Sequence, residues 1–136
     1  MLSARVSAEH EATFDAAVLV VRADERTWAK LCLELSPQGE VMVVSVVTRG
    51  ASDDCNSRPI SGNEACLRMA RMGRAFAFHY SLDSQRWSMV RYFTLGEVDT
   101  VEIGFLAQSP TGLGCTAAFE DILFIPERLA DVRSGI

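Results

Sequence analysis

The stretch Phe76–Trp87 constrains the fold of this chain more than any other. It reads FAFHYSLDSQRW. Apolar residues alternate with smaller or polar ones from Phe76 to Leu82, a polar turn follows, and Trp87 begins the next segment. Alternation with a period of two is typical of a strand that buries one face. The stretch therefore predicts a β-hairpin in an all-β fold, with one sheet face buried and the other left available.

Similar strand-like segments recur along the chain, with turn-forming residues between them. Several are rich in β-branched residues, which favour pleated strands over helices. No helical pattern separates them, so an antiparallel sandwich is favoured over an alternating βαβ fold. The predicted strands are Ala16–Arg22, Thr27–Leu35, Val41–Arg49, Ala65–Met72, Arg74–Leu82, Trp87–Leu95, Val101–Gln108 and Cys115–Phe124.

Two segments do not follow the strand pattern. Gly50–Asn63 is polar and is predicted to be the longest loop, and long loops on rigid sheets often carry function. Pro126, followed by Glu127–Arg133 and Gly135, predicts at most one short C-terminal helix. A chain of 136 residues is long enough to bury a core without a disulfide or a metal. We expect a single domain, residues 1–136.

Composition excludes several classes of partner. Lys and Arg total 13 against 18 Asp and Glu, a net charge of −5, so no nucleic-acid partner is expected. No stretch approaches the ~20 apolar residues of a membrane span, and the N-terminus does not read as a signal peptide, so we expect a cytoplasmic protein without a membrane partner. Three of the four cysteines lie in apolar strand patterns, whereas Cys55 lies in a polar loop and is the most reactive candidate. We expect no structural disulfide.

Four strings carry a resemblance to a known family. They are FDAAVLVVRADERTWAKLCLE, VVSVVTRGASDDCNS, FAFHYSLDSQRW and IGFLAQSPTGLGCTAAFEDI, in that order. With this order and spacing the chain resembles the regulation-of-enolase-type family of the concanavalin A-like lectin/glucanase superfamily. The resemblance implies a jelly-roll sandwich of two antiparallel sheets, which agrees with the strand pattern.

The chain departs from that family in two ways. Members usually carry a further N-terminal block of strands before the segment that begins here near Ser3, so we expect an N-terminally shortened sandwich. The hairpin turn usually reads Asp-Gly, whereas this chain has Asp83 followed by Ser84. A turn residue at positive φ therefore costs more here than it would with glycine.

The sequence argues against glycoside hydrolysis. Retaining glycosidases of this superfamily use two carboxyl groups about 5–5.5 Å apart. Glu34 stands alone on its predicted strand, and the adjacent Glu120 and Asp121 are expected to point to opposite faces. We therefore expect no enzymatic activity, no catalytic residue and no cofactor.

One face of the predicted strand Thr27–Leu35 is a candidate sugar-binding patch. Trp28, Lys30, Cys32 and Glu34 share the face opposite the leucines, and Trp28 could act as a stacking platform. The other interpretation is a solvated sheet face with an ordinary surface ion pair, which contributes about 0–1 kcal/mol. The residues leave both interpretations open.

Other polar residues offer weaker signals. Arg49, beside the predicted loop with Asp53, could bind a carboxylate or phosphate, although Asp and Ser also commonly satisfy turn backbones. His79 is one of two histidines, and a lone histidine is more often structural than catalytic. Asp53, Asp54 and Asn56 resemble half of a calcium loop without its further ligands, so no metal site is expected.

The predicted function is non-catalytic binding, with a carbohydrate or sugar-containing metabolite as the leading ligand. The alternatives are a regulatory protein–protein interaction module, which the family name favours, and a degenerate glycoside hydrolase-like domain. This assignment rests largely on fold analogy. The candidate ligand-binding residues are Trp28, Lys30, Glu34, Arg49, Asp53, His79, Arg91 and Gln108.

A shortened sandwich also predicts assembly. If the N-terminal strands of the family are missing, the apolar strand Ala16–Arg22 is exposed at a sheet edge, and such edges pair with other chains. A two-fold homodimer is the simplest cover. The alternative is that Met1–Thr13 folds back as a short covering strand, since Leu2, Ala4 and Val6 alternate.

Overall fold

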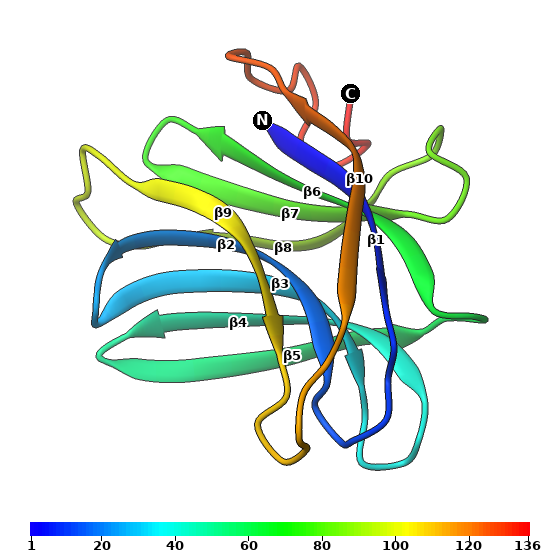
Figure 1. The fold of residues 1–136 in the computed structure, drawn as a ribbon. Helices are drawn as coiled ribbons and strands as arrows, with labels where there is room; N and C mark the ends of the chain where they lie inside the picture. The colour runs from blue at the N-terminus through cyan, green and yellow to red at the C-terminus, as the bar shows by residue number, and fades with distance from the viewer.

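The structure, a computed structural model, describes all residues 1–136 and consists of ten strands with no helix. They form two five-stranded antiparallel sheets that pack face to face (Figure 1). The strands are β1 Leu2–Ala8, β2 Ala16–Asp24, β3 Thr27–Leu35, β4 Val41–Arg49, β5 Ala51–Pro59, β6 Glu64–Met72, β7 Ala75–Ser81, β8 Ser88–Thr94, β9 Glu102–Gln108 and β10 Ala117–Phe124. Sheet A has the order β10-β1-β6-β7-β8, and sheet B has the order β5-β4-β3-β2-β9. The predicted β-sandwich is confirmed.

The core lies between the two sheets and is built by alternate residues of each strand. Phe76 and Phe78 of β7 pack on Phe93 of β8, with ring centroids 5.8 and 4.7 Å apart. Leu19 and Leu31 of sheet B are fully buried against this layer. The alternation of the hairpin therefore predicted its inner face correctly.

The outer face of β7 is not available, contrary to expectation. His79 and Ser81, which point away from the core, are as buried as the inner residues. The cause is the C-terminal segment, which runs over sheet A: the Nε2–H of His79 donates to the carbonyl oxygen of Val132 at 2.7 Å, and Arg68 on β6 donates to that of Gly135 at 2.6 Å. This segment contains no helix, because the carboxylate and carbonyl of Asp131 instead hold a tight turn through residue 136.

The prediction that Gly50–Asn63 forms a loop was wrong for most of that segment. Residues 51–59 form β5, the edge strand of sheet B, paired with β4. Gly50 adopts φ of 79°, which permits the tight turn from β4 into β5. An exposed edge strand needs no buried apolar face, and polar, charged and proline residues discourage further pairing there.

The N-terminal residues form a strand, β1, as in the alternative in which Met1–Thr13 folds back to cover the sheet edge. β1 lies between β10 and β6, with Leu2, Ala4 and Val6 facing the core. Ala16–Arg22 lies within β2, which is paired with β3 on one side and β9 on the other. The premise that this apolar strand is an open edge was therefore wrong.

The turn after β7 adopts the positive-φ conformation that costs more with serine than with glycine. Ser84 has φ of 60°, a region that glycine enters without strain. Asp83 compensates by accepting hydrogen bonds from the backbone N–H groups of Gln85 and Arg86 at 2.9 and 2.8 Å. The turn thus keeps its shape without the glycine.

Candidate functional site

The outer face of sheet B carries a hydrogen-bonded group of polar side chains. Here "outer face" means the side chains that point away from the core. No strand packs on it, because sheet A covers only the other face. The registers of β2 with β3 and β9 align Gln108, Ala16 and Glu34 across three strands. Trp28 and Lys30 lie further along β3 on the same face.

A small residue allows two long side chains to meet above the sheet. Ala16 lies between Gln108 and Glu34 in the register, and its methyl group leaves space over β2. The Nε2 of Gln108 donates to Glu34 Oε2 at 3.1 Å and to the carbonyl oxygen of Phe14 at 2.8 Å. Lys30 Nζ donates to Gln108 Oε1 at 2.7 Å. The three side chains form a hydrogen-bonded chain from β3 to β9 and back.

The Glu34 carboxyl is held in an unusual electrostatic state. The residue is only 9% exposed. Burial raises its pKa, and the nearby carboxylate of Asp54 raises it further, whereas Lys30 and the hydrogen bond from Gln108 act to lower it. This partly desolvated carboxyl holds the amide of Gln108, which in turn holds the ammonium of Lys30.

A shallow groove lies beside this chain. Its volume is about 430 Å³, and Trp28, Lys30 and Gln108 line it together with Val20, Arg22, Glu25 and Leu106. Ligand sites typically combine apolar walls with a few placed polar groups, and this groove has both. An indole ring at its wall offers a flat apolar surface.

The buried residues at the base of this outer face are chemically unreactive. Val18 and Cys32 have no exposure although no strand covers them, so the surrounding side chains close over them. Burial raises the pKa of the Cys32 thiol to about 12, which keeps it protonated. Cys32 is therefore not a nucleophile. Cys55 is exposed as predicted, although it lies on β5 and not in a loop.

Three of the other predicted site residues lie where β4 and β5 of sheet B meet β8 of sheet A. Arg49 forms an ion pair with Asp53 at 3.7 Å and donates to the carbonyl oxygen of Thr94. Arg91 of β8 donates to the carbonyl oxygen of Asp53 at 3.0 Å. These contacts link β4 and β5 to β8 across the two sheets, and they leave the guanidinium of Arg49 engaged within the protein.

His79 is separate from both groups. It lies on sheet A beneath the C-terminal segment, with no exposure. Burial lowers its pKa, and the neighbouring Arg68 guanidinium lowers it further, against the hydrogen bond to Val132. The eight predicted residues thus divide into three places: Trp28, Lys30, Glu34 and Gln108 on the outer face of sheet B, Arg49, Asp53 and Arg91 at the β5–β8 edge, and His79 under the C-terminal segment.

The carboxylates are arranged differently from the expectation. Glu120 and Asp121 do not point to opposite faces, because Asp121 has φ of 49° and β10 is irregular there, so both approach Arg5 at 3.4 and 3.0 Å. On sheet B, Asp54 accompanies Glu34, which the sequence missed because Asp54 was assigned to a loop. No group of three or more His, Cys, Asp or Glu is placed to hold a metal ion.

Comparison with known proteins assigns the chain to a family. Residues 1–126 match the family described as "Protein of unknown function (DUF1349)". The chain belongs to this family. It is 29% identical over 119 residues to "Regulation of enolase protein 1" of Saccharomyces cerevisiae, which covers 86% of this chain and 59% of that protein. The chain therefore spans about three-fifths of the length of this curated relative.

Solved structures give the same result for the fold. A structure described as a functionally unknown protein from Saccharomyces cerevisiae superposes with a TM-score of 0.81 and 28% identity, over 90% of this chain and 66% of that chain. The GH43 protein BlXynB from Bacillus licheniformis superposes with a TM-score of 0.77 and 15% identity, over 87% of this chain and 25% of that one. At that identity the second likeness shows the β-sandwich fold alone. No helix in the chain is long and apolar enough to cross a membrane.

Proposed function

We propose that the outer face of sheet B binds a carbohydrate or a sugar-containing metabolite. The observation that carries the proposal is the hydrogen-bonded chain of Lys30, Gln108 and Glu34 beside the indole of Trp28. Sugar hydroxyls donate and accept hydrogen bonds at once, so they suit a cation, an amide and a carboxyl placed together. The apolar C–H face of a pyranose ring suits a flat aromatic surface.

The proposed binding is non-catalytic. Glu34 has no close carboxylate partner of the kind that retaining hydrolysis needs, about 5–5.5 Å away. Asp54 is near enough to influence the pKa of Glu34, but it lies two strands away, on β5. We expect aryl glycosides to remain unhydrolysed. Turnover that Glu34→Gln abolishes would instead support the degenerate hydrolase that the sequence left open.

A screen on a glycan array, followed by thermal shift with each hit, tests the proposal. The wild-type protein should bind at least one sugar, and Trp28→Ala and Lys30→Met should each lose that binding while remaining folded. Arg49→Ala is the matched control, because Arg49 is half-exposed and its guanidinium already contacts Asp53 and Thr94. Binding that Arg49→Ala removes and Trp28→Ala leaves intact would place the site at the β5–β8 edge and contradict the proposal.

A regulatory interaction with a protein is the second candidate function. It is supported by the name of the curated relative, "Regulation of enolase protein 1". Direct binding to enolase is the simplest physical form of such regulation. A silent glycan screen, together with co-sedimentation of purified enolase with this protein, would favour this candidate over the sugar-binding face.

A further inference from the structure

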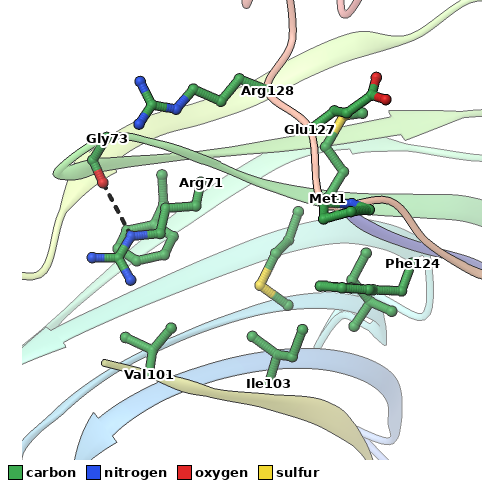
Figure 2. Close-up of a pocket in the computed structure, with 12 residues that line it drawn as sticks. Met1, Arg71, Gly73, Val101, Ile103, Phe124, Glu127 and Arg128 are labelled. Carbon is green, nitrogen blue, oxygen red and sulfur yellow. Dashed lines mark hydrogen bonds between the residues drawn. The ribbon is translucent and has the colours of Figure 1, made fainter. Parts of the chain in front are cut away.

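A second cavity opens between the two sheets, at the end where β1 begins and β10 ends (Figure 2). Its volume is about 350 Å³. Leu2, Met69 and Phe76, which belong to the core, line its inner part, and Val101, Ile103 and Phe124 line its outer part. It shares no residue with the groove on sheet B.

The lining of the cavity exposes apolar surface to solvent. Covering that surface with an apolar molecule is favourable, because it removes apolar area from water. Ile103 and Phe124 are 42% and 61% exposed at the outer part of the cavity, whereas Phe76 is 1% exposed. The accessible apolar surface of the cavity therefore lies over Ile103 and Phe124, and the core residues form its closed floor. An open apolar hollow of this kind suits a hydrocarbon chain that lies along it. Pockets of this size fall at the lower end of small-molecule sites.

Positive charge gathers at one side of the rim. The guanidinium of Arg71 is fixed by hydrogen bonds to the carbonyl oxygens of Gly73, Val98 and Asp99 at 2.8–3.0 Å, and it forms no ion pair. Arg128 has neither a hydrogen bond nor an ion pair within the protein. In Figure 2 both guanidinium groups lie toward the Gly73 turn, whereas the carboxylate of Glu127 points to the opposite side.

This arrangement is complementary to a molecule with an apolar chain and an anionic end. We propose that the cavity binds a free carboxylic acid of medium chain length. The hydrocarbon chain lies along Val101, Ile103 and Phe124. The carboxylate pairs with Arg128 beside the fixed charge of Arg71. An arginine guanidinium matches a carboxylate with two parallel hydrogen bonds, and Arg128 is free to make them.

Calorimetric titration with octanoate tests the proposal, with hexanoate, octyl glucoside and octylamine as comparisons. Each methylene group buried should tighten binding by about fourfold, so octanoate should bind more tightly than hexanoate. Octanoate should also bind more tightly than the neutral glucoside and the cationic amine. Equal affinity for the three octyl compounds, or the absence of saturable octanoate binding, would overturn the proposal.

Two variants test the carboxylate and the hydrocarbon chain of the ligand separately. Arg128→Ala should weaken octanoate about fivefold and leave octyl glucoside unchanged, since a single exposed ion pair is lost. Ile103→Glu should abolish octanoate binding by placing a negative charge at the outer part of the cavity. Ile122→Glu is the matched control, because Ile122 is also exposed, on the neighbouring β10, but does not line the cavity. Equal loss in both isoleucine variants would contradict the assigned site.

The same experiments distinguish a free carboxylic acid from a membrane lipid as the ligand. Vesicles of phosphatidylglycerol present an anionic head with chains that are buried in the bilayer, whereas octanoate in solution offers its whole chain. The proposal predicts that the protein stays in the supernatant when such vesicles are sedimented. Co-sedimentation that Arg128→Ala abolishes, without octanoate binding in solution, would show a membrane surface as the partner and overturn the proposal.

Discussion

Among single residues, Glu34 determines most directly what the outer face of sheet B can do. Opposing effects act on the pKa of its carboxyl. Burial and Asp54 favour the protonated form, whereas Lys30 and Gln108 favour the charged form. The sequence predicted the position of Glu34 on this face from the alternation of β3. It did not predict the contact with Gln108, because that contact depends on the registers of β2 with two neighbours and on the small side chain of Ala16.

The opposing contributions at Glu34 can be separated by titration. Lys30→Met removes a stabilising cation and should raise the pKa of Glu34 further above its wild-type value. Asp54→Asn removes a repelling carboxylate and should lower it. Carboxyl ¹³C chemical shifts, followed against pH by NMR, measure both changes. A Glu34 pKa that moves in the same direction in the two variants would contradict the arrangement described here.

Among elements, the C-terminal segment and β5 show where sequence patterns fail. The alternation of β7 identified its buried inner face, but nothing periodic in residues 125–136 indicated that they would cover the outer face. β5 escaped detection because an edge strand with both faces exposed has no apolar pattern. The two-sheet arrangement was predictable, since β-branched residues fill the central strands. The alternation of Leu2, Ala4 and Val6 indicated β1 only as the alternative to a homodimer.

The attachment of the C-terminal segment should depend on pH through His79. Its folded pKa is lowered below the ordinary 6.5, so the unfolded chain binds more protons than the folded one below that pH. The stability contribution of neutral His79 is therefore complete above about pH 6.5 and is lost as the pH falls toward the folded pKa.

Urea unfolding of the wild type and of His79→Gln, compared from neutral to mildly acidic pH, measures this effect. Glutamine keeps a donor for the Val132 carbonyl but does not titrate. The wild type should lose stability relative to His79→Gln as the pH falls below about 6.5, while other titrating groups cancel in the difference. A difference that stays constant across this range would show that protonation of His79 is not linked to folding.

At the scale of the whole molecule, the two sides of the sandwich differ in what they offer to another chain. β5 is polar and charged, which discourages pairing. On the other side, β10 is the outermost strand of sheet A, and Ile122 and Leu123 are exposed on it. The interface at β2 that the sequence predicted for a homodimer does not exist, because β2 is paired on both sides. We propose that the homodimer forms through β10, at residues that do not line the cavity between the sheets.

Sedimentation equilibrium at micromolar concentration tests this assembly. The wild type should sediment as twice the 14.9 kDa chain mass, and Leu123→Glu should sediment as a monomer. Leu82→Glu is the control, because Leu82 is similarly exposed in the turn after β7. A monomeric wild type at every concentration would rule out the dimer and leave β1 as sufficient completion of the sheets.

The proposed sugar-binding face is tested most directly by the two tryptophan indoles, which lie on opposite outer faces. Trp28 lines the groove on sheet B, whereas Trp87 packs under the guanidinium of Arg68 on sheet A, 4.1 Å from its ring centroid. Proton–nitrogen NMR spectra of the protein, titrated with the strongest ligand from the glycan array, report on both indole N–H groups at once. We predict that the Trp28 signal shifts in a saturable manner and that the Trp87 signal stays in place. Movement of Trp87 alone, or of neither, would contradict the assignment of sheet B as the binding face.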